Sequence, residues 1–169
     1  LNQGTVSAVL AGATAAVSKT GAGTVTLGAA NTHGGGTEVS GGTLSLGADG
    51  ALPTGKAVTV NGGTLDLNGH SPSAGSFALS GGSVINTGVG TAALGATQFT
   101  LSQGTVSAAL AGTNAVLSKT GVGTVVLNAV NRYGGGTQVS DGTLSLGADG
   151  ALPDGRALTV SGGTLDLNG

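Results

Sequence analysis

The chain has 169 residues, among them 36 glycines and three aromatic residues, and its lack of cysteine excludes a disulfide scaffold and thiolate metal sites. Charged residues make up 7% of the sequence, the net charge is −2 and the five basic residues are scattered, so the basic patch that nucleic-acid binding requires is missing. Hydrophobic residues still reach 38%, which favours a packed core over a disordered glycine-rich linker. No apolar run approaches the roughly 18 residues of a membrane helix, so we expect no membrane insertion by this segment.

Two repeats, one nested in the other, organise the chain. Residues 1–69 align without gaps on residues 101–169 and differ at 18 of the 69 positions. We therefore expect a single segment over residues 1–169, with a first five-coil block at 1–100 and an incomplete second block at 101–169. A shorter unit inside the blocks, with a period of about 20 residues, starts with Gly, then Thr or Ser, then an aliphatic residue. The Thr or Ser of its nine starts lies at positions 5, 24, 43, 64, 83, 105, 124, 143 and 164.

Each unit has the pattern of two short β-strands. Residues 24–27, 43–46 and 64–67 alternate strictly between polar and aliphatic side chains, which places the aliphatic ones on one face of a strand. A second short strand precedes most unit starts, at residues 37–39, 57–60, 77–79 and 99–101. Paired glycines such as 41–42 and 62–63 separate the two strands and predict tight turns. No stretch of about ten residues has the 3.6-residue period of a helix, so we predict an all-β chain.

Strands this short cannot bury a face alone, but they can when they stack as successive coils. We therefore predict a parallel β-helix, or β-solenoid, of about nine coils of 19–22 residues. A propeller blade would need about 40 residues per unit. The first inward column is expected to contain Val6, Val25, Leu44, Leu65, Val84, Val106, Val125, Leu144 and Leu165. The second is expected to contain Ala8, Leu27, Leu46, Leu67, Asn86, Ala108, Leu127, Leu146 and Leu167, with Asn86 as its irregular member.

The sequence around the second and third unit starts is similar to a known repeat. SKTGAGTVTL at residues 18–27 and NTHGGGTEVSGGTL at residues 31–44 resemble the autotransporter-associated β-strand repeat, also called the passenger-associated transport repeat. Residues 118–144 resemble it as well and have Tyr133 where the repeat has Tyr. The departures are His33, Gly34, Gly134, Arg132 and Asp141, and none of them conflicts with the fold. The resemblance implies a right-handed parallel β-helix in the passenger of a type V secreted protein, a class that carries a signal peptide and usually a C-terminal outer-membrane β-barrel.

The candidate catalytic and metal-binding side chains are two histidines and seven carboxylates: His33, His70, Glu38, Asp49, Asp66, Asp141, Asp149, Asp154 and Asp166. We expect His33 in a solvated loop, because the second block has Tyr133 in its place, and His70 in a turn. A β-helix hydrolase or lyase needs carboxylates gathered in one groove. Asp66 and Asp166 are expected about 24 Å apart along the rod. Asp149 and Asp154 flank one loop, but the first block has Asp49 and Thr54 there.

We therefore predict no catalytic, cofactor-binding or metal-binding residue, no cofactor and no enzymatic activity. Asp49 lies in a Gly-Asp pattern that resembles calcium-binding turns, and turn stabilisation is the expected role. Outward Thr-x-Thr pairs such as residues 24 and 26 would suit an ice-binding face, but Asp66, Ile85, Val126 and Asp166 interrupt that array. Half-exposed strands favour Thr in any case.

The sequence favours a structural rod or stalk in an autotransporter-like surface passenger, extracellular or at the bacterial cell surface, that supports secretion and adhesion or self-association. One alternative is a repetitive binding surface for ice, glycan or a self-assembling filament. A second is the scaffold of a β-helix enzyme whose active site lies outside this segment. The expected partners are the neighbouring coils of the same long chain. Because the chain starts at Leu1 and stops at Gly169 in mid-pattern, we also expect association end to end or side by side.

Overall fold

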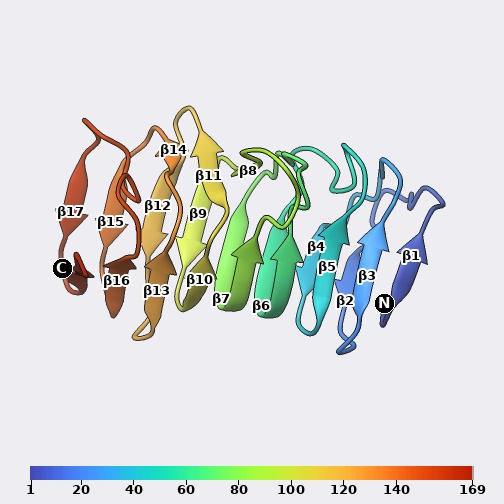
Figure 1. Ribbon diagram of the computed structural model, residues 1–169, viewed down its shortest axis with the longest axis horizontal. Helices are drawn as coiled ribbons and strands as arrows, with labels where there is room; N and C mark the ends of the chain where they lie inside the picture. Colours follow the sequence, from blue (N-terminus) through green and yellow to red (C-terminus); the bar gives the residue numbers. More distant parts are fainter. Residues whose placement is uncertain (169) are drawn as a thin grey trace.

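The computed structural model describes residues 1–168 and shows a rod of stacked β-coils (Figure 1). Eighteen strands and no helix occur in the described part of the chain. Every strand pairing in it is parallel, so each coil hydrogen-bonds to the coil before and the coil after it. The predicted all-β parallel solenoid is confirmed.

Three stacks of strands form the faces of the rod. The first stack is β1 (Gly4–Val6), β3 (Thr24–Leu27), β5 (Thr43–Leu46), β6 (Val58–Asp66), β7 (Phe77–Ile85), β10 (Gly104–Val106), β13 (Thr124–Leu127), β16 (Thr143–Leu146) and β18 (Thr164–Asp166). The second stack is β2 (Val17–Lys19), β4 (Thr37–Val39), the first halves of β6 and β7, β9 (Gln98–Leu101), β12 (Val116–Lys119), β15 (Thr137–Val139) and β17 (Leu158–Val160). The third, short stack is β8 (Ala93–Gly95), β11 (Ala109–Gly112) and β14 (Arg132–Tyr133).

The number of coils is close to the prediction. The first stack has nine strands within residues 1–168, one for each predicted unit start, and about eight turns connect them. Strands β6 and β7 are the long exceptions, because each bends at its glycine pair and continues from the second stack into the first.

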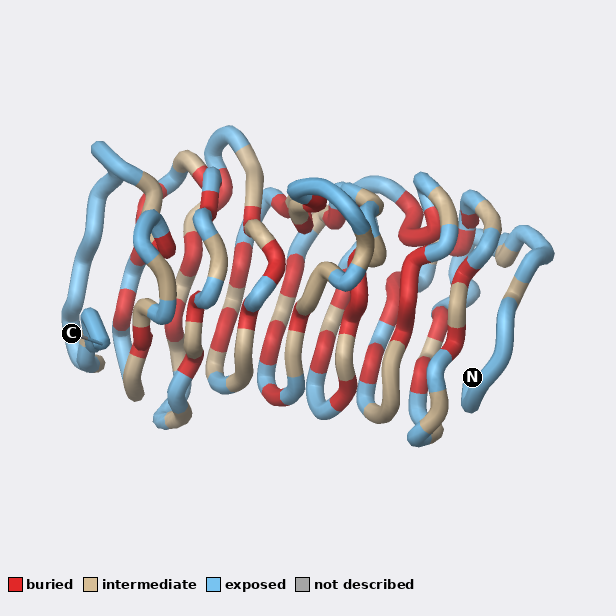
Figure 2. Tube along the Cα trace, viewed as in Figure 1, coloured by how far each residue is buried: buried red, intermediate tan, exposed pale blue. Residues whose placement is uncertain are grey.

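The core is an aliphatic column that runs along the inside of the rod. Val25, Leu44, Leu65, Val84 and Val106 are all at most 1% exposed. Figure 2 shows that the buried residues gather in the middle coils, whereas the coils at both ends are mostly exposed. Apolar burial contributes about 25 cal/mol per Å² of surface removed from water, so each added coil stabilises the coil beneath it.

The predicted stacking is wrong by two residues at one place in each block. The spacing of unit starts puts Val6 on Val25, but Val6 pairs with Leu27, and in the second block Val106 pairs with Leu127. A shift of two residues keeps every side chain on the same face, so the alternation of apolar and polar residues cannot distinguish the two registers. The true steps from β1 to β3 and from β10 to β13 are therefore longer than the spacing of the unit starts.

Asn86, the irregular member of the second predicted column, lies just beyond the end of β7 and does not face the core. Its Oδ1 accepts a hydrogen bond from the Gly69 amide at 2.7 Å, and its Nδ2 donates to the Gly90 carbonyl at 3.0 Å. Asn86 therefore fastens the loop that follows β7 to the preceding coil.

Aromatic side chains fill the middle of the rod. The rings of Phe77 and Phe99 lie on paired strands with their centroids 6.2 Å apart, in an edge-to-face arrangement. The ring of Tyr133 continues the series at 6.2 Å from Phe99. All three side chains are at most 1% exposed, and such ring pairs add to the stabilisation from burial alone.

Candidate functional site: the inner polar residues of each repeat

The carboxylates that the sequence offers for chemistry are dispersed over several coils. Asp49 contacts Nδ1 of His70 at 2.8 Å on the surface, and Glu38 accepts a hydrogen bond from Nδ2 of Asn61 at 2.7 Å. Asp66 is buried and accepts hydrogen bonds from the Thr87 hydroxyl at 2.6 Å and from the Thr87 amide at 3.0 Å. Within residues 1–168, no three His, Asp or Glu side chains gather in a way that could hold a metal ion.

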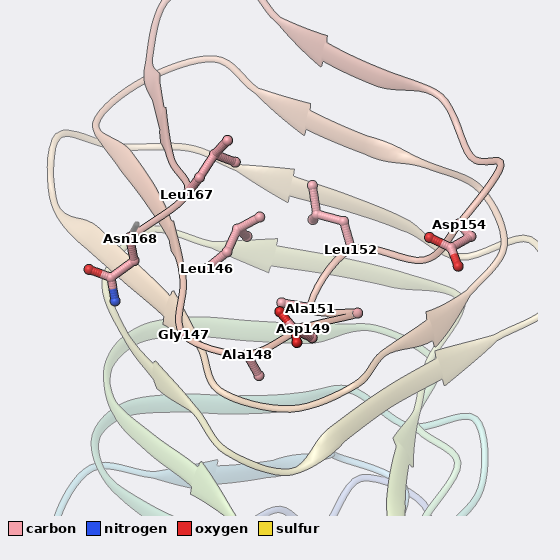
Figure 3. Close-up of a pocket in the computed structure, with 10 residues that line it drawn as sticks. Leu146, Gly147, Ala148, Asp149, Ala151, Leu152, Asp154, Leu167 and Asn168 are labelled. Atoms are coloured by element: carbon pink, nitrogen blue, oxygen red, sulfur yellow. The ribbon is translucent and has the colours of Figure 1, made fainter.

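The other carboxylates support turns or line an open hollow. Asp141 accepts a hydrogen bond from the neighbouring Gly142 amide at 2.8 Å, and Asp166 accepts one from the Asn168 amide at 3.0 Å. Asp149 and Asp154 both line a hollow of about 460 Å³, where they lie on different parts of one loop with Leu152 between them (Figure 3).

This hollow lies on the last coil that the structure describes. Leu146 and Leu152 are partly exposed there, whereas the equivalent Leu46 and Leu52 of the first block are buried beneath the following coil. The residues that line this hollow in the second block are therefore equivalent to the residues of the first block on which the following coil packs. The shape of the hollow follows from the stacking of coils and needs no ligand to explain it.

His33 is not in a solvated loop, so that expectation is wrong. Its side chain is 1% exposed and faces the inside of the rod, as Tyr133 does in the second block. Nε2 of His33 lies 3.0 Å from Oγ1 of Thr37, while Nδ1 has no hydrogen-bond partner. Burial without a charged partner lowers the pKa of His33 below its ordinary value.

The Tyr133 hydroxyl makes the matching contact in the second block, 2.8 Å from Oγ1 of Thr137. Burial raises the pKa of Tyr133 to about 12, although the hydrogen bond with Thr137 acts in the opposite direction. Two chemically different rings thus occupy one inner position. The short Thr side chain four residues later supplies a polar partner for either ring.

A buried lysine in each block was not anticipated from the sequence, where the five basic residues are only seen to be scattered along the chain. Lys19 and Lys119 are 0% exposed. The Lys119 ammonium donates to the carbonyls of Thr120 at 3.1 Å, Gly121 at 2.7 Å and Asp141 at 2.9 Å. Desolvation lowers the pKa of Lys119, and the nearby Asp141 carboxylate partly offsets this effect. The ammonium thus joins the turn after its own strand to the corresponding turn of the next coil.

A buried asparagine in each block connects three consecutive coils. Oδ1 of Asn131 accepts a hydrogen bond from the Leu110 amide at 2.8 Å, and Nδ2 donates to the Ala151 carbonyl at 2.7 Å. Asn31 makes the same two bonds with Leu10, at 2.8 Å, and with Ala51, at 2.7 Å. Since buried polar groups are costly unless they are paired, each amide is satisfied only when the coils on both sides are docked.

The buried polar side chains therefore concentrate in two stretches of the chain. We call Lys19, Asn31, His33 and Thr37, with their counterparts Lys119, Asn131, Tyr133 and Thr137, the inner polar residues. Comparison with known families finds the passenger-associated transport repeat over residues 17–46 and again over residues 117–146, and both ranges enclose these residues. The chain contains two passenger-associated transport repeats. The resemblance seen in the sequence is confirmed, and the solenoid fold agrees with a passenger-type structural repeat.

Comparisons with curated proteins and with solved structures found no match. In the described part of the chain, no helix is long and apolar enough to span a membrane.

The two repeat copies themselves hold a signal that could have revealed the inner polar residues. Lys19 and Asn31 recur unchanged as Lys119 and Asn131, although neighbouring positions differ. Ala30, for example, is replaced by Val130. A polar residue that stays fixed between two diverging copies of one coil indicates a specific hydrogen-bonding position rather than a solvated loop.

Proposed function

We propose that this segment is a structural rod in the exported passenger of an autotransporter-like protein, located outside the cell or at the bacterial cell surface. The observation that carries the proposal is the presence of two passenger-associated transport repeats in one uninterrupted parallel ladder. The dispersed carboxylates favour this role over catalysis.

The organisation of contacts supports a part in secretion. Each strand of the ladder pairs only with strands of the preceding and following coils, about 20 residues away. Coils of this kind can fold one after another as the chain leaves a narrow channel, because a new coil needs only the last folded coil as its template. The buried lysine and asparagine of each repeat add polar bonds that form as the next coil docks.

A display experiment tests this function. The chain is placed between a signal peptide and an outer-membrane β-barrel, and intact cells are treated with protease. We expect a protease-resistant rod at the cell surface. A matched fusion with Leu44→Asp and Leu144→Asp, which charges two core positions, should lose that resistance. Retention of the unmodified chain in the periplasm, while a reference passenger is displayed, would refute the proposal.

We also propose side-by-side self-association through the outer surface of the second stack. A column of small polar side chains follows this surface from coil to coil: Thr20, Ser40, Asn61, Ser80, Ser102, Thr120, Ser140 and Ser161. Glu38, which accepts a hydrogen bond from Asn61, is a charged side chain beside this column, and the second block has the neutral Gln138 in its place. Two copies would therefore meet with little charge repulsion. Sedimentation velocity over a range of concentrations tests this, with Ser80→Glu and Ser140→Glu together as the variant expected to remain monomeric. A sedimentation coefficient that is independent of concentration in the unmodified chain would exclude self-association.

A further inference from the structure

Two stacking registers are available where β10 docks on β13, and the apolar pattern fits both. In the observed register Val106 pairs with Leu127. In a register shifted by two residues Val106 would pair with Val125, so an aliphatic residue would still cover an aliphatic residue. The shifted register would repeat the shorter step that the rod already uses between β13 and β16. Neither the alternation of side chains nor the length of the coil excludes it.

We infer that Asn131, and Asn31 in the first block, select the register by which the preceding coil docks. Oδ1 of Asn131 accepts a hydrogen bond from the Leu110 amide. Leu110 and Asn131 are separated in the sequence by the same number of residues as the paired Thr105 and Val126. In the shifted register Leu110 would lie opposite residue 129, and Oδ1 would lose this donor. Because Asn131 is 4% exposed, water does not readily replace the missing bond.

The other half of the amide fixes the orientation of Asn131. Nδ2 donates to the Ala151 carbonyl of the following coil, and the Asn131 backbone amide donates to the Gly150 carbonyl at 3.0 Å. These two bonds direct Oδ1 toward the preceding coil. Buried polar groups of this kind can specify register even where they add little to stability.

Asn31 gives an independent second case within the same molecule. Its Oδ1 accepts the Leu10 amide at 2.8 Å, and Thr5 pairs with Thr26 rather than with Thr24. In each block, a two-residue shift of this kind is possible where β1 docks on β3 or β10 docks on β13. The inner asparagine of the block lies on the same coil as β3 or β13. Register selection by these asparagines would act while the rod folds, wherever the rod functions.

Engineered cysteines can report the register directly, since the chain has no cysteine of its own. Thr105 and Val126 are partners on the outer side of their strands, so T105C/V126C should form a disulfide in the observed register. T105C/T124C should form one only in the shifted register. In the observed register the Cα atoms of residues 105 and 124 are about 8 Å apart, given the strand spacing and the rise per residue. That separation is beyond disulfide reach.

We expect the full chain to cross-link as T105C/V126C and not as T105C/T124C. Adding N131L should reduce the first product and raise the second several-fold, as measured by non-reducing peptide mapping. N131D keeps the acceptor for the Leu110 amide, so it should retain the original cross-link even if the rod is less stable. N114L, at an exposed asparagine of the preceding coil, is the matched control and should leave both yields unchanged.

The same comparison in the first block sets T5C/T26C against T5C/T24C, with N31L as the variant. Should N131L fail to fold, N131S replaces it, because serine lacks the reach for both bonds. An N131L or N131S chain that is less stable but keeps the T105C/V126C cross-link in full yield would overturn the inference. It would assign the register instead to the close packing of Gly134 on Thr113, where a Cβ would lie 1.9 Å from the Thr113 carbonyl oxygen.

Discussion

The hydroxyl of Tyr133 lies 2.8 Å from the hydroxyl of Thr137, at the inner position that the first repeat fills with His33 and Thr37. The two copies thus bury an ionisable ring of very different acidity at one place in the coil. Since Tyr133 titrates far above neutral pH and His33 does not, the two blocks should respond differently to mild acid.

Stability should fall as the pH decreases below about 6.5, the ordinary histidine value. Burial lowers the pKa of His33 in the folded rod, so the unfolded chain binds more protons in the interval between the two pKa values. The effect of one such group cannot exceed about 1.4 kcal/mol per pH unit. Urea unfolding at pH 7.5 and pH 5 measures this difference.

The H33Y variant copies Tyr133 into the first block and serves as the control for His33. In H33Y the free energy of unfolding should depend less on pH over the same interval. The surface His70 is present in both chains, so only the buried ring differs between them. An equal loss of stability at pH 5 in H33Y and in the unmodified chain would show that His33 is not the responsible group.

Replacing Lys119 with Met should destabilise the rod by about 2 kcal/mol. Three carbonyls lose their donor. Because they are only part-buried, water can replace some of these bonds, so the loss stays near the low end of the about 1–3 kcal/mol for each buried acceptor, and removal of the buried charge offsets part of it. The control is K56M at an exposed lysine, which should change stability by less than about 0.5 kcal/mol. Chemical denaturation of both variants provides the comparison, and equal midpoints would contradict the role given to the Lys119 ammonium.

Gly142 should not tolerate a side chain, and Gly155 provides the matched comparison. Both have positive φ, 61° for Gly142 and 66° for Gly155, so alanine at either site has a backbone penalty of about 1–2 kcal/mol. A Cβ at Gly142 would lie 2.4 Å from the Gly123 carbonyl oxygen and 2.7 Å from Nζ of Lys119, whereas nothing lies within 4 Å at Gly155. We expect G142A to be clearly less stable than G155A in thermal unfolding. Similar melting temperatures would show that the turn relaxes.

Truncating Phe99 to Ala should be among the most damaging core substitutions, with a loss of about 3–5 kcal/mol. Its ring contacts those of both Phe77 and Tyr133, so the change opens a cavity and breaks two ring contacts at once. F99L fills most of the space and should cost much less. Urea unfolding of F99A and F99L provides the test. Equal urea midpoints for the two variants would contradict the central role given to the Phe99 ring.

The alternation of apolar and polar residues was sufficient to predict the fold and most of the core. Val25, Leu44 and Leu65 lie inward as predicted, because one strand period and one coil period determine their positions. The same pattern was insufficient for Val6 and Val106, because a two-residue shift preserves the face of every side chain.

The inner polar residues were missed for a different reason. A single Lys or Asn among glycines and threonines is typical of a solvated loop, and only the stacked neighbour reveals the carbonyl that it contacts. Partners of Lys119 and Asn131 lie in neighbouring coils, about 20 residues away, at Asp141 and Ala151 in the next coil and at Leu110 in the preceding one. A local pattern therefore cannot identify them, although comparison of the two repeat copies can.

The hydrogen bonds between coils all point along the long axis of the rod. A pull on the two ends of the segment would therefore peel the terminal coil and load the bonds of one coil at a time. Each coil that detaches would release about 20 residues, which corresponds to about 65–75 Å of extended chain. Under tension the rod should therefore lengthen in a series of similar steps at low force, while the coils that have not yet detached stay folded.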